Sequence, residues 1–333
     1  MKKTILYLIT FSVTTAYTSQ NIYVTEYTSF SEYKSAVNKS YMHTFDEFRS
    51  KRAFEENVNI VRQHNKLFEK GERSYRLRTN IMADMNGESY LRNFLRLLQS
   101  KRFGNEIDFE SDIVGSSLMP QPPEAIDWRE KGFKTQSANQ KTCGSCYAFS
   151  IAESIEGQVF KRTGRVLNLS PQQIVDCSVT FGNQGCTGGS LRNTLKYLEA
   201  TGGLMREQDY KYVSKKDKCQ FAAELAVVNV TSWAVLPTKD EKAIKTAVAH
   251  IGPIPISINA SPRTFQLYSD GVYDDDSCTS DTVNHAMLVV GYTKHYWILK
   301  NWWGEMWGED GYMRLRRGTN LCGIANYAAY SIV

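Results

Sequence analysis

Two cysteines, Cys143 and Cys146, stand two residues apart in a segment that could support three different chemistries. A zinc site would need further closely spaced Cys or His ligands, and the sequence has no second close pair. A redox pair of this spacing belongs between a strand and a helix, yet residues 135–140 are polar. We therefore favour nucleophilic chemistry, and we expect no metal ion and no other cofactor.

Cys146 stands at the start of an apolar pattern with helical spacing that covers residues 146–163 and ends at Gly164. Unpaired backbone N–H groups at the N-terminus of a helix favour a thiolate over a thiol. A thiolate attacks a carbonyl carbon far better than a thiol does. This placement makes Cys146 the candidate nucleophile, whereas the simpler alternative is a buried, inert cysteine.

A thiolate needs a partner base, and histidine is the usual one. Four of the five histidines belong to a removable region, a helix end or a hairpin turn: His43, His64, His250 and His295. The fifth, His285, leads into an apolar run over residues 286–292, and Asn301 ends the neighbouring run over residues 296–301. An Asn oxygen can accept from the imidazole N–H and orient the ring, so we predict that these two residues pair.

A tetrahedral intermediate on a carbonyl carbon also needs hydrogen-bond donors for its oxyanion. Gln140 lies six residues before Cys146 and offers a side-chain NH₂, and the backbone N–H of Cys146 offers a second donor. On the residues alone, Gln140 is equally well explained as an ordinary loop residue.

The N-terminus has the order of a secretory signal peptide, which we place at residues 1–16: a basic head, an apolar run and small residues. The secretory pathway is oxidising and favours disulfides. The chain has seven cysteines, an odd number, which predicts three bridges and one free thiol that is either reactive or simply buried.

Residues 17–118 contain no cysteine and are rich in charge, with helices predicted over residues 45–70 and 87–101. The proline-rich residues 119–123 indicate a junction. An ordinary linker between two domains is the alternative, but the signal peptide favours a removable pro-segment followed by a peptidase domain at residues 119–333.

The region after the junction changes from helical to strand-like patterns, which predicts an α+β fold. The helices are predicted over residues 146–163, 170–177, 190–200 and 240–250, and the strands over 286–292, 296–301 and 311–317. The net charge of +5 includes no dense basic run, so we expect no nucleic-acid partner. No later run reaches about 18 apolar residues, so we expect no membrane anchor.

These residues resemble the papain family of cysteine proteases, and within it the cathepsin L-like branch. The signature around the nucleophile reads Cys143-Gly144-Ser145-Cys146-Tyr147. Four further motifs match the family: Asp127-Trp128-Arg129, Asn139-Gln140, Asn284-His285-Ala286 and Lys300-Asn301-Trp302-Trp303-Gly304. A fifth, Cys186-Thr187-Gly188-Gly189, resembles the motif that lines the family's substrate cleft.

The resemblance implies a two-lobed papain-like fold, a helical lobe plus a β-barrel-like lobe, preceded by a helical inhibitory pro-segment. It implies the bridges Cys143–Cys186, Cys177–Cys219 and Cys278–Cys322, which leaves Cys146 free. It also implies that Gln140 polarises the scissile carbonyl, that His285 is the acid and base, and that Asn301 orients His285. The substrate-binding residues would be Gly188, Gly189, Ser190, Leu191, Ser257, Ala286, Tyr327, Trp303 (which would also shield His285 and Asn301) and Trp307.

Three positions depart from the family pattern. Tyr147 replaces a tryptophan after the nucleophile, and we expect little effect. Trp302 replaces a small serine, and we expect its bulk to bear on substrate access. Tyr327 stands where the floor of the S2 pocket usually has a small residue. We expect an apolar, shallow pocket without an acid, and hence an apolar residue at substrate position P2.

The pro-segment matches more loosely, through Phe54, Asn57, Val61 and Asn65 and a short motif that ends at Asp84. The resemblance implies that it crosses the cleft in reverse and blocks it, and we expect acid to release it by protonating carboxylates such as Asp84. The expected partners are peptide or protein substrates and cystatin-like inhibitors, and the expected state is a monomer.

We expect a location in the lysosome or outside the cell, with glycosylation at the Asn229 sequon of the mature part. Two other classes of protein are disfavoured relative to an active endopeptidase. A non-catalytic peptide-binding relative is disfavoured because all four catalytic positions are filled. A disulfide-stapled binding module is disfavoured by the unpaired cysteine and by the length of the chain.

Overall fold

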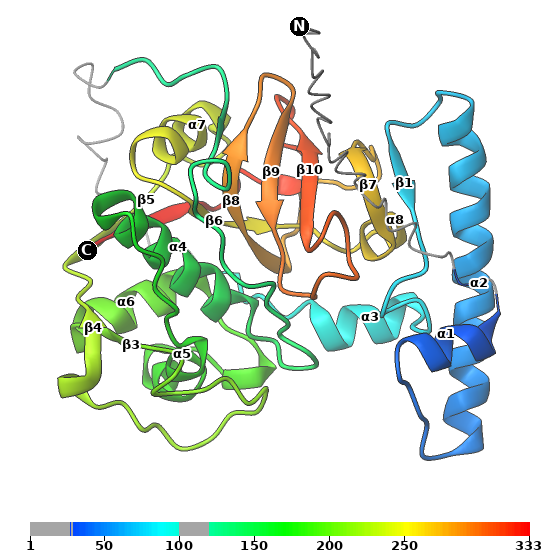
Figure 1. The fold of residues 1–333 in the computed structure, drawn as a ribbon, viewed down its shortest axis with the longest axis horizontal. Helices are drawn as coiled ribbons and strands as arrows, with labels where there is room; N and C mark the ends of the chain where they lie inside the picture. The colour runs from blue at the N-terminus through cyan, green and yellow to red at the C-terminus, as the bar shows by residue number, and fades with distance from the viewer. Residues whose placement is uncertain (1–26, 28, 100–119) are drawn as a thin grey trace, which may run out of the picture.

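The computed structural model describes residue 27, residues 29–99 and residues 120–333 (Figure 1). The predicted signal peptide, residues 1–16, and the predicted boundary between pro-segment and peptidase domain at residues 118 and 119 lie outside the described residues. Within them the chain forms a helical lobe, a sheet lobe and an N-terminal segment along the outer edge of the sheet lobe.

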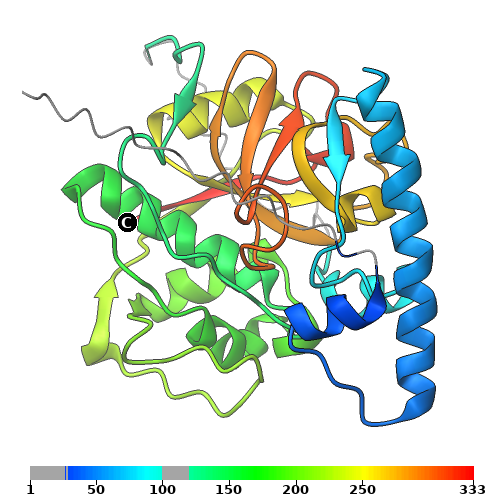
Figure 2. The same ribbon diagram turned by 45° about the vertical axis from the view of Figure 1, so that its right-hand side comes forward.

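The N-terminal segment consists of α1 (Phe30–Ala36), α2 (Thr44–Glu69), β1 (Tyr75–Leu77) and α3 (Gly87–Phe94). The predicted helix at residues 45–70 is confirmed as α2. It lies alongside β1 (Figure 2), where the Asn65 side chain donates to and accepts from the backbone of Leu77, both at 2.9 Å. The prediction of a helix to residue 101 is wrong, because the chain after α3 forms backbone hydrogen bonds with the lobes instead.

The helical lobe is built on α4 (Cys146–Thr163), α5 (Pro171–Cys177) and α6 (Leu191–Thr201), as the sequence predicted. α4 ends at Gly164, whose φ of 70° is left-handed and suits glycine at a helix C-terminus. Ser170 and Ser190 cap α5 and α6 by accepting a backbone N–H with the side-chain oxygen. The lobe also contains η1 (Ser178–Phe181), η2 (Gly185–Thr187), η3 (Ala223–Leu225), β3 (Leu204–Met205) and β4 (Ala226–Val228).

The sheet lobe contains seven hydrogen-bonded strands, one of them from the N-terminal segment, in the order β1-β7-β10-β9-β8-β2, and β6 also pairs with β8. This order does not close on itself within the described chain, so the lobe is an open sheet, which corrects the barrel-like expectation. The strands are β2 (Ile126–Asp127), β6 (Ile254–Ile258), β7 (Tyr268–Tyr273), β8 (His285–Tyr292), β9 (Tyr296–Lys300) and β10 (Tyr312–Arg316). The remaining elements are α7 (Glu241–His250), α8 (Arg263–Gln266), η4 (Leu321–Gly323) and the pair β5 (Ser232–Val235) and β11 (Ala329–Ile332).

The two lobes meet where α4 packs against β8 and β6. Gly157 of α4 lies so close to Pro253 that a Cβ atom there would be 2.6 Å from the proline ring. Lys300 and Glu153 form a buried ion pair across the contact, with Nζ and Oε2 2.7 Å apart. Breaking such a pair leaves a buried charge, which costs about 3–5 kcal/mol, so this pair helps to fix how the lobes face each other.

Candidate active site

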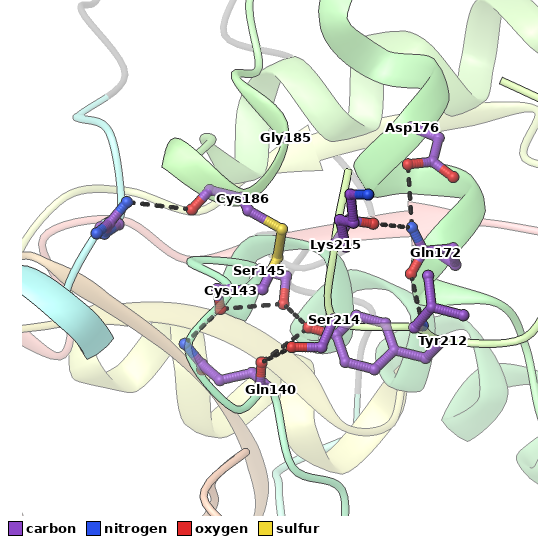
Figure 3. The surroundings of a disulfide bond; sticks show 12 residues. Gln140, Cys143, Ser145, Gln172, Asp176, Gly185, Cys186, Tyr212, Ser214 and Lys215 are labelled. Carbon is purple, nitrogen blue, oxygen red and sulfur yellow. Dashed lines mark hydrogen bonds between the residues drawn. A yellow bond between two sulfur atoms is a disulfide. The ribbon is translucent and has the colours of Figure 1, made fainter. Parts of the chain in front are cut away.

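Cys146 is the first residue of α4 and is fully buried. The other six cysteines form the three expected bridges: Cys143–Cys186, Cys177–Cys219 and Cys278–Cys322. Cys146 is therefore the free cysteine, as the odd count and the resemblance predicted. The Cys143–Cys186 bridge ties the segment before Cys146 to η2 (Figure 3).

His285 begins β8 and faces Asn301, which follows β9. His285 Nε2 lies 2.8 Å from Asn301 Oδ1, which also accepts the backbone N–H of Trp302 at 2.8 Å. Because a carboxamide oxygen only accepts, Nε2 carries the proton and Nδ1 is the basic nitrogen. The backbone N–H of Ala286 stabilises negative charge on the Cys146 sulfur, which places the thiol beside this strand.

Burial keeps both reactive groups neutral in this form of the protein. It raises the pKa of Cys146 to about 12, although backbone N–H groups of Ala286, Tyr147 and Cys146 oppose the shift. It also lowers the pKa of His285 to about 4, against the hydrogen bond to Asn301. In the precursor, Cys146 is therefore a thiol and His285 a neutral imidazole. Burial outweighs the stabilisation of a thiolate by the N-terminus of α4.

Aromatic rings enclose His285. Trp303 stacks on it with ring centroids 4.8 Å apart, and Trp307 meets Trp303 edge-on at 5.0 Å. Two rings of α3, Tyr90 and Phe94, pack edge-on against Trp303 at 5.8 and 5.9 Å. The N-terminal segment thus covers the face of the site that these two tryptophans form.

The side chain of Gln140 is fully buried beside the segment before Cys146. Its Nε2 donates to the carbonyl of Cys143 at 3.1 Å and to the carbonyl of Phe94 at 3.4 Å. A carbonyl of the N-terminal segment therefore occupies the donor that the sequence assigned to an oxyanion. The geometry suits Gln140 for polarising a carbonyl group placed at this point.

Residues 94–99, which we call the crossing segment, run between the lobes. Leu97 forms an isolated parallel bridge with Gly189, and its N–H donates to the Asn284 carbonyl at 3.0 Å. The N–H of Leu98 donates to Gly189 at 2.9 Å. A Cβ on Gly188 would lie 2.1 Å from the Arg96 carbonyl, so the glycine pair allows close passage of a chain.

Three of the expected S2 residues, Leu191, Ser257 and Tyr327, line a cavity of about 510 Å³ together with Leu97. Asp281 lines the same cavity, so the expectation of a pocket without an acid is wrong. Asp281 lies in the irregular chain before β8, where no sequence pattern indicates which way a residue faces.

The other expected pocket residues have further contacts. Ser190 caps α6 with its side chain, and the carbonyl of Ala286 accepts the indole N–H of Trp302 at 2.9 Å. The Trp302 ring is fully buried and stacks on Phe149 at 5.7 Å. The Trp302 side chain, which stands where the family pattern has a small serine, is therefore accommodated in the contact between the lobes.

Tyr147 lies beneath the glycine pair. A Cβ on Gly189 would be 2.7 Å from the Tyr147 ring, and the Tyr147 hydroxyl donates to the Gly185 carbonyl at 3.0 Å. Sequence reasoning missed Tyr212, whose hydroxyl contacts the backbone of Gln140 and the side chain of Ser145. Tyr212 lies far along the chain from Gln140 and Ser145, so no local sequence pattern could indicate these contacts.

This arrangement, an unpaired cysteine at a helix N-terminus facing a His–Asn pair with a segment across the cleft, defines the class. The chain matches the papain family cysteine protease over residues 122–332 and the cathepsin propeptide inhibitor domain (I29) over residues 30–90. It therefore belongs to the papain family, and it is a cysteine endopeptidase made as a zymogen with its own pro-segment as inhibitor.

Known proteins of similar length agree with this assignment. The chain is 40% identical to cathepsin K of Mus musculus over 306 residues, which covers 90% of this chain and 91% of the relative. It is 38% identical to cathepsin L of Sarcophaga peregrina over 320 residues, with coverage of 90% and 91%. The structure of digestive procathepsin L 3 from Tenebrio molitor larval midgut superposes with a TM-score of 0.80 at 35% identity, over 91% of this chain and 97% of that one.

Two features are absent from the residues that the structure describes. None of their helices is long and apolar enough to cross a membrane. They contain no group of three or more Cys, His, Asp or Glu side chains that could hold a metal ion.

Proposed function

We propose that Cys146 is the nucleophile of this protease and that His285 is its acid and base. The Cys146 thiol proton passes to His285 Nδ1, and the thiolate attacks the scissile carbonyl carbon. Gln140 Nε2 and the Cys146 N–H stabilise the oxyanion. His285 then protonates the leaving amine as the C–N bond breaks, which leaves a thioester on Cys146. Water, deprotonated by His285, hydrolyses the thioester and releases the acid.

The observation that supports this most directly is the hydrogen bond of 2.8 Å between His285 Nε2 and Asn301 Oδ1. It fixes the tautomer in which Nδ1 is the base, beside the free Cys146. We expect acid-matured protein to cleave a peptide amide, and the Cys146→Ser variant to lose at least 10³-fold in kcat/KM. A Cys146→Ser variant of unchanged activity would show that another group is the nucleophile.

We propose an apolar preference at P2, because Leu97 of the pro-segment lines the same cavity as Leu191 and Tyr327. Lys239 and Asp281 line the same cavity with opposite charges, so their net charge does not favour a charged P2 residue. A substrate library should rank Leu above Arg at P2. Preference for Arg in the native enzyme, lost in an Asp281→Asn variant, would assign the pocket to basic side chains.

We propose that maturation cuts the chain near residue 118 and that acid loosens the pro-segment through Asp84. This carboxylate is 6% exposed and accepts from the Tyr33 hydroxyl at 2.9 Å and the Tyr41 hydroxyl at 2.6 Å. It also pairs with Lys39. Loss of the Asp84 charge would leave Lys39 without this partner. We therefore expect a Cys146→Ala precursor to retain its pro-segment less well at pH 4 than at pH 7. Equal retention at both values would contradict the proposal.

We propose that the protein enters the secretory pathway, loses residues 1–16 and acts as a monomer in the lysosome or outside the cell. Asn229 supports glycosylation there, because it is exposed and lies in a sequon. Mass spectrometry of secreted protein, before and after amidase treatment, tests both the new N-terminus and the glycan. Titration with a cystatin tests the expected class of inhibitor.

A further inference from the structure

The loop after β3 reaches back to the segment that carries the oxyanion donors (Figure 3). Its residue Tyr212 has a hydroxyl that donates to the Gln140 carbonyl at 2.9 Å. The same hydroxyl lies 2.6 Å from the Ser145 Oγ. Since its proton is used on Gln140, the Ser145 hydroxyl serves as the donor of the second bond. One phenol oxygen therefore bridges Gln140, whose side chain carries one proposed oxyanion donor, and Ser145, which precedes Cys146 and its backbone N–H, the other proposed donor.

The Tyr212 hydroxyl is suited to hold this bridge. Burial raises the pKa of Tyr212 to about 12, so the hydroxyl keeps its proton at any pH at which a protease of this class is active. The ring packs edge-on against Phe149 of α4, with centroids 4.7 Å apart. Position and protonation are thus fixed by contacts other than the bridge itself.

The loop that presents Tyr212 is anchored on α5. Gln172 accepts the N–H of Val213 at 2.9 Å and donates to the Lys215 carbonyl at 2.8 Å. Asp176 accepts the N–H of Asp217 at 2.7 Å and the Tyr210 hydroxyl at 2.8 Å. The Cys177–Cys219 bridge closes the same loop. The bridge to the oxyanion donors therefore stands on a fixed support in the helical lobe.

We infer that Tyr212 is a positioning residue for the oxyanion hole, which it holds at the spacing that a tetrahedral intermediate needs. The inference rests on the proposed roles of Gln140 and Cys146. Oxyanion donors must lie within a narrow range of distance and angle, and losing one costs about 10²–10³ in kcat. Loosening the donors without removing either should cost less, on the order of 3–10-fold.

The test uses Tyr212→Phe, which keeps the ring on Phe149 and deletes only the hydroxyl. The matched control is Tyr292→Phe, which deletes a hydroxyl that donates to the Pro123 carbonyl at 3.0 Å, at the end of β8 farthest from His285. Three quantities are measured on matured enzyme: kcat/KM for a peptide amide, the inhibition constant of a peptide aldehyde, and the rate of Cys146 alkylation by iodoacetamide. The aldehyde forms a tetrahedral adduct with an oxyanion, whereas alkylation forms none.

We expect Tyr212→Phe to lower kcat/KM about 3–10-fold through kcat and to weaken the aldehyde by the same factor, with alkylation unchanged. Tyr292→Phe should alter none of the three. The inference is overturned if Tyr212→Phe matches the native enzyme, if alkylation falls in proportion, or if Tyr292→Phe has the same effect. The variant Gln140→Ala tests the proposed function separately from the role of Tyr212. Native aldehyde affinity in that variant would overturn the oxyanion role of Gln140 itself.

Discussion

The pro-segment holds the enzyme in two different ways. Its larger part, residues 29–90, which we call the anchoring part, adds β1 to the sheet through antiparallel pairing with β7. The Asn80 side chain donates to the Gln266 carbonyl at 2.7 Å, and the Gln266 side chain donates to the Met82 carbonyl at 2.8 Å. The Tyr90 hydroxyl donates to the Ala260 carbonyl at 2.7 Å. These side-chain contacts are buried, and none of them is made to Cys146.

The crossing segment, by contrast, makes short backbone contacts with both lobes. Leu97 and Leu98 donate to Asn284 and Gly189, and the Phe94 carbonyl accepts from Gln140. The two regions therefore differ in role: the anchoring part supports the affinity of the pro-segment for the enzyme, and the crossing segment blocks the cleft. The anchoring part makes buried side-chain hydrogen bonds to the enzyme, whereas the crossing segment passes between the lobes beside Gln140 and Gly189.

The largest effect should come from removing the pro-segment, including the crossing segment. Burial raises the pKa of Cys146 to about 12 in the precursor, so at pH 7 only about one thiol in 10⁵ is ionised. We expect iodoacetamide to alkylate Cys146 at least 10³-fold faster in the matured enzyme, as measured by mass spectrometry of the labelled peptide. Comparable rates in the two forms would show that the precursor does not bury the thiol.

The anchoring part depends on its own core, in which Phe54 is 1% exposed and lies 4.8 Å from the Tyr33 ring. Phe54→Ala should destabilise the pro-segment by about 3–5 kcal/mol through lost packing. In a full precursor, activity should then appear at neutral pH. The control is Phe48→Ala on the same helix, because Phe48 is 58% exposed and should have little effect. Equal activation by both variants would contradict the assignment of affinity to this core.

Much of the site was predictable because its residues carry local signals. Cys146 begins an amphipathic helix, and His285 and Asn301 flank two apolar runs, so chemistry and elimination identified them before any contact was known. The helix prediction for residues 45–70 matched α2 within one residue at each end. Periodicity determines these features, and periodicity is visible in the sequence.

Features that depend on contacts between distant segments were not predictable from the residues. The helix predicted to residue 101 ends at Phe94, because the N–H groups of Leu97 and Leu98 donate to Asn284 and Gly189 instead of continuing the helix. Pairing of β1 with β7 joins segments nearly 200 residues apart. Tyr212 lies in a loop without periodicity. In each case a partner far along the chain overrides local preference.

Covering His285 should also make the precursor sensitive to acid. Burial lowers the pKa of His285 to about 4, whereas the unfolded imidazole takes up a proton near pH 6.5. Between these values the unfolded state binds more protons, so stability falls as the pH is lowered, by about 3 kcal/mol in total. Urea unfolding of a Cys146→Ala precursor at pH 6.5 and pH 4 measures the loss.

The contribution of His285 is isolated by comparing two variants in that background. His285→Asn should reduce the loss of stability at pH 4, whereas His295→Gln should not, because His295 is exposed in the turn between β8 and β9. If both variants lose stability to the same extent as the parent, the acid sensitivity arises elsewhere, with Asp84 and its contacts in the anchoring part as the first candidates.

The smallest effect should come from a single side chain of the crossing segment. Leu97 is 9% exposed and lines the cavity beside Leu191 and Tyr327, which is open toward solvent. Leu97→Ala should therefore weaken binding of the pro-segment by about 2 kcal/mol. This value is near the lower end of the cost of truncating a buried leucine, because solvent can fill the space that is left. Added in trans to the matured enzyme, a pro-segment with this change should inhibit about 30-fold less well. Gln99→Ala, at an exposed neighbouring position, should inhibit normally. A loss larger than that of Phe54→Ala would reverse the comparison, because the crossing segment would then supply most of the affinity.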